Sequence, residues 1–179
     1  MGATQPSAGS RAFKVISAVP FANPFTWYQI EGTAVQSRLI RDMASAASAM
    51  TAFDTWVSNL DRRYPGNLLV REDVTSSPVR VQVAYIDYAS SMSRAWQDEA
   101  WRNADVVGLF PPDIMFDLAS AAESVGRIEK LPDGQIREVV TRIPESFLHA
   151  DSRELILAGL LDRKQRLLSI LQTVYPGLR

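Results

Sequence analysis

An uninterrupted helical repeat is the feature that most constrains what this chain can fold into. Apolar side chains recur at alternating spacings of four and three residues, at Leu39, Met43, Ala46, Met50, Phe53, Val57 and Leu60. That spacing places them on one face of an α-helix. No Pro or Gly occurs from Thr33 to Arg63, and Tyr64-Pro65-Gly66 follows. We therefore predict one long helix that ends at this tripeptide.

Small side chains fill part of the same stretch. Residues 44–49 read ASAASA, and side chains of this size let a second helix approach closely. Trp56 extends the repeat and is expected in the core. The pattern indicates a helix that packs against other helices.

Residues 67–102 are open to two interpretations. Leu68 to Val70 could form a strand, and Val79, Val81 and Val83 alternate with polar residues, which predicts a small hairpin near 68–83. The competing interpretation begins a helix with Ser77 as N-cap and Pro78 at the first helical position, running to Arg102. We favour the helix because apolar residues continue at helical spacing as far as Ala95.

The carboxyl-terminal third predicts further helices. One opens at Pro112 and Asp113, and its expected buried residues are Ile114, Leu118, Ala121, Ala122, Val125 and Ile128. A turn at 131–134 precedes one or two helical turns, whose apolar residues are Ile136, Val139, Val140 and Ile143.

The last predicted helix begins at Asp151 or Ser152, because either can cap it and Glu154 stands three residues after Asp151. Its apolar face holds Leu157, Leu160, Leu161, Leu168, Leu171 and Val174. Residues 162–166, DRKQR, form the expected solvated side, and Pro176-Gly177 ends the helix.

These elements predict an all-α, or mainly α, fold. We expect a bundle of four to five helices, with the hairpin near 68–83 as the one β alternative. The chain has 179 residues, 46% hydrophobic and 22% charged, which suits one globular domain. We expect that single helical domain to span 13–179.

The amino-terminal region differs in composition. Residues 1–12 are small and polar, and we expect a disordered tail. Residues 13–25 are apolar, but Pro20 and Pro24 exclude a helix interior. We predict an extended arm that takes part in self-association or partner binding through Phe13, Val15, Ile16, Phe21 and Phe25.

Catalytic and metal-binding patterns are sparse in the sequence. The chain has no Cys and one His, His149, so thiolate chemistry, disulfides and zinc sites built from Cys are excluded. The neighbours Asp98 and Glu99 point to different sides of a helix, and Asp113 and Asp117 are explained as acids near a helix N-terminus. We expect no cofactor and no metal ion.

Aromatic and basic residues supply the remaining candidates. Trp96 and Trp101 lie roughly 140° apart around a helix and cannot both face one core. Either they bridge two helices of the chain, or they join Trp27 at an interface with a partner. Arg38, Arg41, Arg62 and Arg63 are the candidates for phosphate contacts, and a solvated helix surface is the plainer explanation for them.

Charge and targeting signals narrow the function. The formal net charge is −1, no apolar run reaches the length of a membrane span, and no signal peptide is present, so we expect a soluble, intracellular protein. The leading hypothesis is a non-enzymatic subunit or adaptor of a larger assembly, such as a virion or secretion-machine component. The alternatives are a nucleic-acid-associated protein that uses the Arg clusters once oligomerised, and a small all-α enzyme with carboxylate chemistry.

Overall fold

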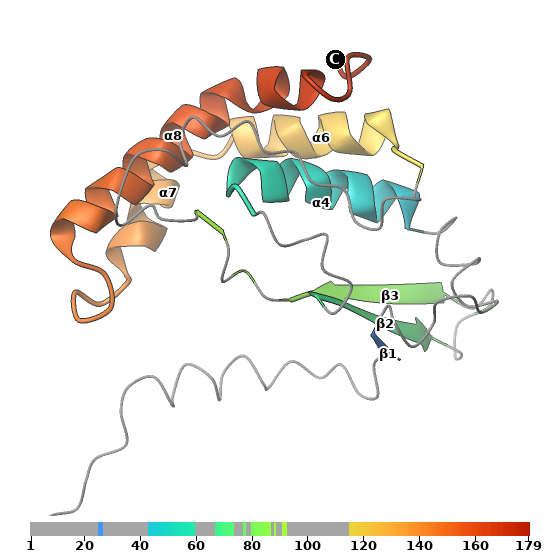
Figure 1. Cartoon of the computed structure of the whole chain (residues 1–179), viewed down its shortest axis with the longest axis horizontal. Coiled ribbons are helices and arrows are strands. Elements are labelled where there is room, and N and C mark those ends of the chain that lie inside the picture. The colour runs from blue at the N-terminus through green and yellow to red at the C-terminus, as the bar shows by residue number, and fades with distance from the viewer. Residues whose placement is uncertain are drawn as a thin grey trace, which may run out of the picture.

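The computed structural model is mainly helical, with one small antiparallel sheet (Figure 1). It describes residues 25–26, 43–59, 67–73, 77, 80–86, 88, 91–92 and 115–179. The elements within these ranges are β1 (Phe25–Thr26), α4 (Ala44–Trp56), β2 (Leu68–Asp73), β3 (Arg80–Tyr85), α6 (Leu118–Glu129), α7 (Asp133–Thr141) and α8 (Ala150–Gln172). The expectation of a mainly helical fold is therefore confirmed.

The sheet follows the hairpin interpretation of the sequence. Its strand order is β1-β2-β3, and β2 pairs with β3 antiparallel, with Val70 opposite Val83. The favoured prediction of a helix from Ser77 is wrong for residues 80–85. Two-residue periodicity lets Leu68 and Val70 of β2 be buried on one face while the strand pairs with β3 through its backbone. Residues 93–102 of that predicted helix lie outside the described residues.

Helix α4 is shorter at its carboxyl end than the apolar repeat predicts. It ends at Trp56 because Ser58 adopts a left-handed conformation with a φ of 51°. The Asn59 amide donates to the Asp54 carbonyl at 2.7 Å and the Ser58 amide to the Thr55 carbonyl at 3.2 Å, the two bonds of a Schellman motif. The predicted continuation through Val57 to Asn59 is wrong, and residues 33–42 and 60–63 lie outside the described ranges.

The buried side of α4 is also rotated from the predicted one. Met43 and Val57 are buried, but Ala46 is exposed and Met50 and Phe53 are half-buried. The side packed among the other helices holds hydroxyl groups instead. Ser48, Thr51 and Thr55 each donate to the carbonyl four residues earlier, at 2.6, 2.9 and 2.7 Å. Because their protons are bound to the helix backbone, these side chains are buried at little cost.

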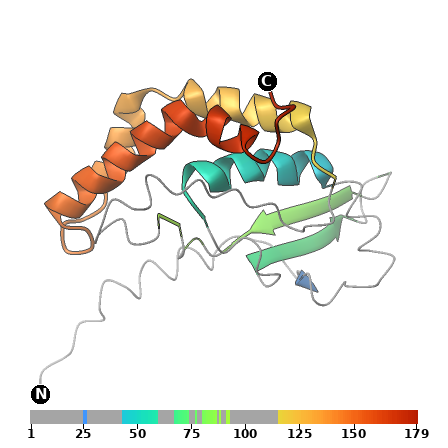
Figure 2. The same ribbon diagram turned by 45° about the horizontal axis from the view of Figure 1, so that its top comes forward.

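Helices α4 and α6 run in the same direction and pack closely side by side (Figures 1 and 2). Two hydrogen bonds join residues 75 positions apart: Ser45 to Ser120 through their hydroxyls, and the Ser124 hydroxyl to the Ala49 carbonyl. The shared offset keeps the two helices in register over the turn from Ser45 to Ala49. The small side chains predicted to permit close approach lie at this contact.

Helix α8 runs the opposite way across α4 and α6, and α7 lies beside its first half (Figure 2). The apolar core between these helices contains Trp56, whose indole Nε1 donates to the Leu160 carbonyl at 2.9 Å. The expected core position of Trp56 is confirmed. In both views the sheet lies beneath α4.

The helix starts differ from the predicted ones. Helix α6 begins at Leu118, with Asp117 as the N-cap accepting from the amides of Ala119 and Ser120. Helix α8 begins at Ala150 with His149 at the N-cap position, so the predicted caps at Asp151 and Ser152 are wrong. An acid in the first turn still favours the start of α8 through the helix dipole.

The predicted buried faces are correct at most of their central positions and wrong near the ends of the helices. Ala121, Val125 and Ile128 are buried as expected, and Ile136 and Val140 of α7 are buried as well. Two residues predicted on buried or apolar faces, Leu118 and Val174, are instead exposed, as are Val139 and Ile143. Arg163, predicted on the solvated side of the last helix, is buried with 0% of its surface exposed.

Candidate functional site

A groove runs along α4 and α6, and Tyr85 at the end of β3 lines one part of it. Its apolar part has a volume of about 520 Å³ and is lined by Ala46, Ala49, Met50, Phe53, Trp56, Tyr85, Ser124, Arg127, Ile128 and Leu131. Its polar part, of about 330 Å³, is lined by Ser45, Ala46, Ala49, Ser120, Glu123, Ser124 and Arg127. Ala46, Ala49, Ser124 and Arg127 line both parts, so the two are continuous. We call the whole the α4–α6 groove.

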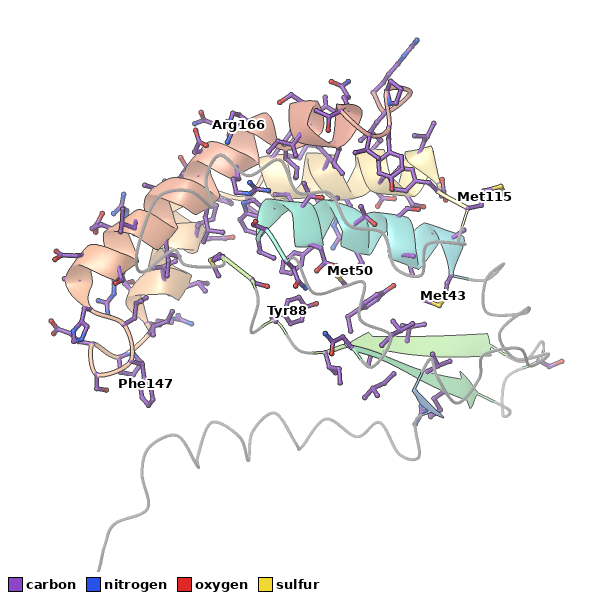
Figure 3. All side chains as sticks on the ribbon, in the orientation of Figure 1. Met43, Met50, Tyr88, Met115, Phe147 and Arg166 are labelled. Carbon is purple, nitrogen blue, oxygen red and sulfur yellow. The ribbon has the colours of Figure 1, made fainter. Side chains whose placement is uncertain are left out.

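The apolar part is held in shape by aromatic contacts. The Phe53 ring meets the rings of Trp56 and Tyr88 edge to face, at centroid distances of 5.9 and 6.0 Å. The Tyr88 hydroxyl donates to the sulfur of Met50 at 3.6 Å, and Figure 3 shows the two side chains together beneath α4. Because Trp56 is also anchored by its bond to the Leu160 carbonyl, this wall has little freedom to move.

The polar part is lined by hydroxyl groups whose protons are already used. The Ser120 hydroxyl donates to Asp117 Oδ2 at 2.7 Å, which leaves Ser45 as the donor in the bond between the two serines. The Ser124 hydroxyl donates to the Ala49 carbonyl at 2.9 Å. At this end of the groove, the serine oxygens can therefore accept hydrogen bonds from a ligand but do not donate them.

Asp117 sets the charge at the start of α6. The hydrogen bond from the Ser120 side chain, with those from the Ser120 and Ala119 amides, lowers the pKa of the Asp117 carboxyl from its ordinary value. Its own amide donates to the Ser48 hydroxyl at 2.8 Å, which ties α6 to α4. The carboxylate is therefore ionised at neutral pH and serves as a cap.

Glu123 and Arg127 are the charged side chains that line the groove. They stand four residues apart on α6, both are exposed, and neither forms an ion pair with any residue that the structure describes. By contrast, the exposed Arg142 pairs with Glu138 on α7, and Lys164 pairs with Asp133 at 2.6 Å. Arg127 is thus a cation at the junction of the polar and apolar parts with its donors available. Within the described ranges, no cluster of three metal-binding side chains occurs.

Exposed apolar side chains gather at the two ends of the helical layer. At one end the α6-start surface consists of Met115 (80% exposed), Leu118 and Val174 (54% exposed). Met115 and Val174 stand next in the chain to Phe116 and Tyr175, whose rings stack with centroids 3.6 Å apart. At the other end the α7-turn surface consists of Val139 (65%), Ile143 and Phe147 (57%). Figure 3 shows Met115 and Phe147 at opposite ends of the molecule.

Most of the candidates named from the sequence lie outside the described residues. This holds for Phe13, Val15, Ile16, Phe21, Trp27, Arg38, Arg41, Arg62, Arg63, Trp96 and Trp101, and for Asp98, Glu99 and Asp113. Phe25 forms β1, where it pairs with Val70 of β2. His149 is exposed at the start of α8. The predicted roles of these residues in binding stay predictions.

The groove and the two end surfaces were not found by sequence reasoning. The polar part of the groove is lined mostly by Ala and Ser, whose spacing predicts helix packing and does not indicate a ligand. The four-residue spacing of the apolar Val139 and Ile143 was the available signal for the α7-turn surface. Comparison of the chain with known protein families, with curated proteins and with solved structures finds no match.

Proposed function

We propose that the protein is a non-enzymatic subunit of a larger assembly, in which copies of the chain join head to tail. The observation that carries this proposal is the presence of two different exposed apolar surfaces at opposite ends of one helical layer. Exposed apolar patches on a folded protein are typical of association sites. Because the two surfaces differ, pairing one with the other produces a heterologous contact, which continues into rings or filaments.

The packing behind each surface supports this role. The α6-start surface rests on the Phe116–Tyr175 stack, and a side chain added at Gly177 would come within 3.2 Å of Leu118. The α7-turn surface is held by Arg153 of α8, which donates to the carbonyls of Ile143 and Leu148 at 2.7 and 3.2 Å. Both surfaces are therefore preorganised, which lowers the entropy lost on association.

The amino-terminal arm remains a second part of the proposal. It joins the described fold at β1, whose pairing with β2 leaves it at the edge of the sheet. Deletion of residues 1–24 retains β1 and removes the other four apolar residues assigned to the arm. We expect the truncated protein to keep its helical circular dichroism and to associate more weakly. A truncated protein that unfolds would show that the arm belongs to the core.

The head-to-tail contact is tested with two single variants and their mixture. Phe147→Asp places a charge on the α7-turn surface, and Met115→Asp places one on the α6-start surface. The matched control is Gln165→Asp, at an exposed position of α8 outside both surfaces. In sedimentation velocity we expect the wild type and the control to associate with rising concentration, and each variant alone to stay monomeric. An equimolar mixture of the two variants should form a heterodimer, because each retains the surface that the other lacks.

Other outcomes of this experiment would contradict the proposal. A wild type that stays monomeric at every concentration would remove it. Association that is abolished by one variant and unaffected by the other would indicate symmetric pairing of like surfaces. The ratio of absorbance at 260 and 280 nm, read on the same samples, tests the nucleic-acid alternative, which depends on arginines outside the described residues.

A further inference from the structure

We propose that the α4–α6 groove binds a single anionic amphiphile, a linear acyl carboxylate whose tail fills the apolar part and whose head group meets Arg127. The site is separate from both end surfaces, so the inference does not depend on the assembly role. Its apolar part, about 520 Å³, falls within the roughly 300–1,000 Å³ typical of small-molecule sites. Such sites combine apolar walls with a few polar groups that orient the ligand.

The walls fit an apolar tail. Met50, Phe53 and Trp56 line the groove from α4, Ile128 and Leu131 line it from the α6 side, and Tyr85 contributes from the end of β3. A flexible thioether beside fixed aromatic rings adapts to the irregular shape of a chain of methylene groups. Each methylene group of the tail that leaves water adds to the favourable free energy of binding.

The charge expected for the ligand head group follows from the hydrogen-bond donors that the groove makes available. The hydroxyl protons of Ser45, Ser120 and Ser124 are used within the protein, so the polar part cannot bind an anion through them. The exposed guanidinium of Arg127 lines both parts and has no ion-pair partner among the described residues. A carboxylate at that point accepts two hydrogen bonds in parallel from the planar guanidinium.

The acidic residues restrict where the carboxylate can lie. Asp117 already places a negative charge at the start of α6, at the far end of the polar part from Leu131. Glu123 stands one turn before Arg127 and repels an anion bound there. The head group is therefore expected at the Arg127 junction, with the tail directed toward Trp56 and Leu131.

Isothermal titration with two probes that share one tail tests this assignment. Sodium decanoate and decyltrimethylammonium, both below their micelle concentrations, are titrated into the full-length protein. We expect one decanoate site, with the cationic probe binding at least tenfold more weakly. In Arg127→Gln, decanoate should bind about tenfold more weakly, because a hydrogen bond to a charged group is lost. Arg137→Gln, an exposed arginine on α7 outside the groove, is the control and should leave the affinity unchanged.

Two further variants separate charge from volume. Glu123→Gln removes the competing carboxylate and should tighten decanoate binding severalfold. Ala46→Phe places a ring in the groove from an exposed helical position and should abolish binding of both probes while the helical circular dichroism is retained. The proposal is overturned if decanoate shows no saturable binding, if both probes bind equally well, or if Arg137→Gln weakens binding as much as Arg127→Gln.

Discussion

The buried Arg163 gives the sharpest test of how the helices are held together. Its Nε donates to the carbonyls of Thr55 and Trp56 at 3.1 and 3.0 Å, and its Nη2 also donates to the Thr55 carbonyl. These are the last two residues of α4, and the final carbonyls of a helix have no partner within it. A guanidinium from α8 therefore completes the end of α4.

The contribution of Arg163 to the free energy of unfolding is estimated for Arg163→Met. This substitution keeps an unbranched apolar stem and removes the guanidinium. Hydrogen bonds to a charged group contribute about 1.5–3 kcal/mol each. The Thr55 carbonyl keeps its hydrogen bond from the Ser58 amide when the guanidinium is removed, so the penalty for an unpaired buried acceptor does not apply to it. Part of this loss is offset because the cation no longer has to be desolvated, so we expect about 3 kcal/mol.

Urea denaturation followed by circular dichroism measures this difference. The control is Arg166→Met, the same substitution three residues later on α8, where the guanidinium pairs with the half-exposed Asp162 at 2.9 Å. We expect the control to lose less than about 1 kcal/mol, the usual range for a surface ion pair. By thermal melting, Arg163→Met should lower the Tm by roughly 6–12 °C, at about 2–4 °C per kcal/mol. Equal losses in the two variants would refute the assigned role of Arg163.

Three smaller predictions concern single positions. Ser58→Gly should raise stability by about 0.5–1 kcal/mol, because serine is strained at a φ of 51°. The control Ser169→Gly, at an exposed position in the last turn of α8, should lower it, and urea midpoints that fall in both variants would contradict this. Asp117→Asn should lower the Tm at neutral pH. Because the pKa of Asp117 is lowered in the folded protein, its contribution is complete above the ordinary pKa and is lost as pH falls through the folded value. The melting difference between the two proteins should therefore shrink below about pH 4, and a constant difference would argue against the cap. Phe53→Ala should cost about 2 kcal/mol in urea denaturation, less than the roughly 3–5 kcal/mol of a fully buried ring, because Phe53 is half-buried.

Helical periodicity located the helices, and it placed buried faces well where apolar residues alone form the contact. The central residues Ala121 and Val125 of α6 lie in the core as predicted. It failed on α4, where hydroxyl side chains such as Thr51 bond to the helix backbone and are buried. A pattern that counts Ser and Thr as polar therefore assigns the wrong side of such a helix. The same reasoning placed Arg163 in solvent, because its carbonyl partners lie more than 100 residues away.

The hairpin shows a different limit of structure prediction from local sequence signals. The segment with Ser77 and Pro78 has local signals for a helix start, but pairing with β2 decides its structure. The groove could not have been predicted either, because it exists only where α4 and α6 lie side by side at a constant offset. What the sequence did supply was the run of small residues that permits this contact.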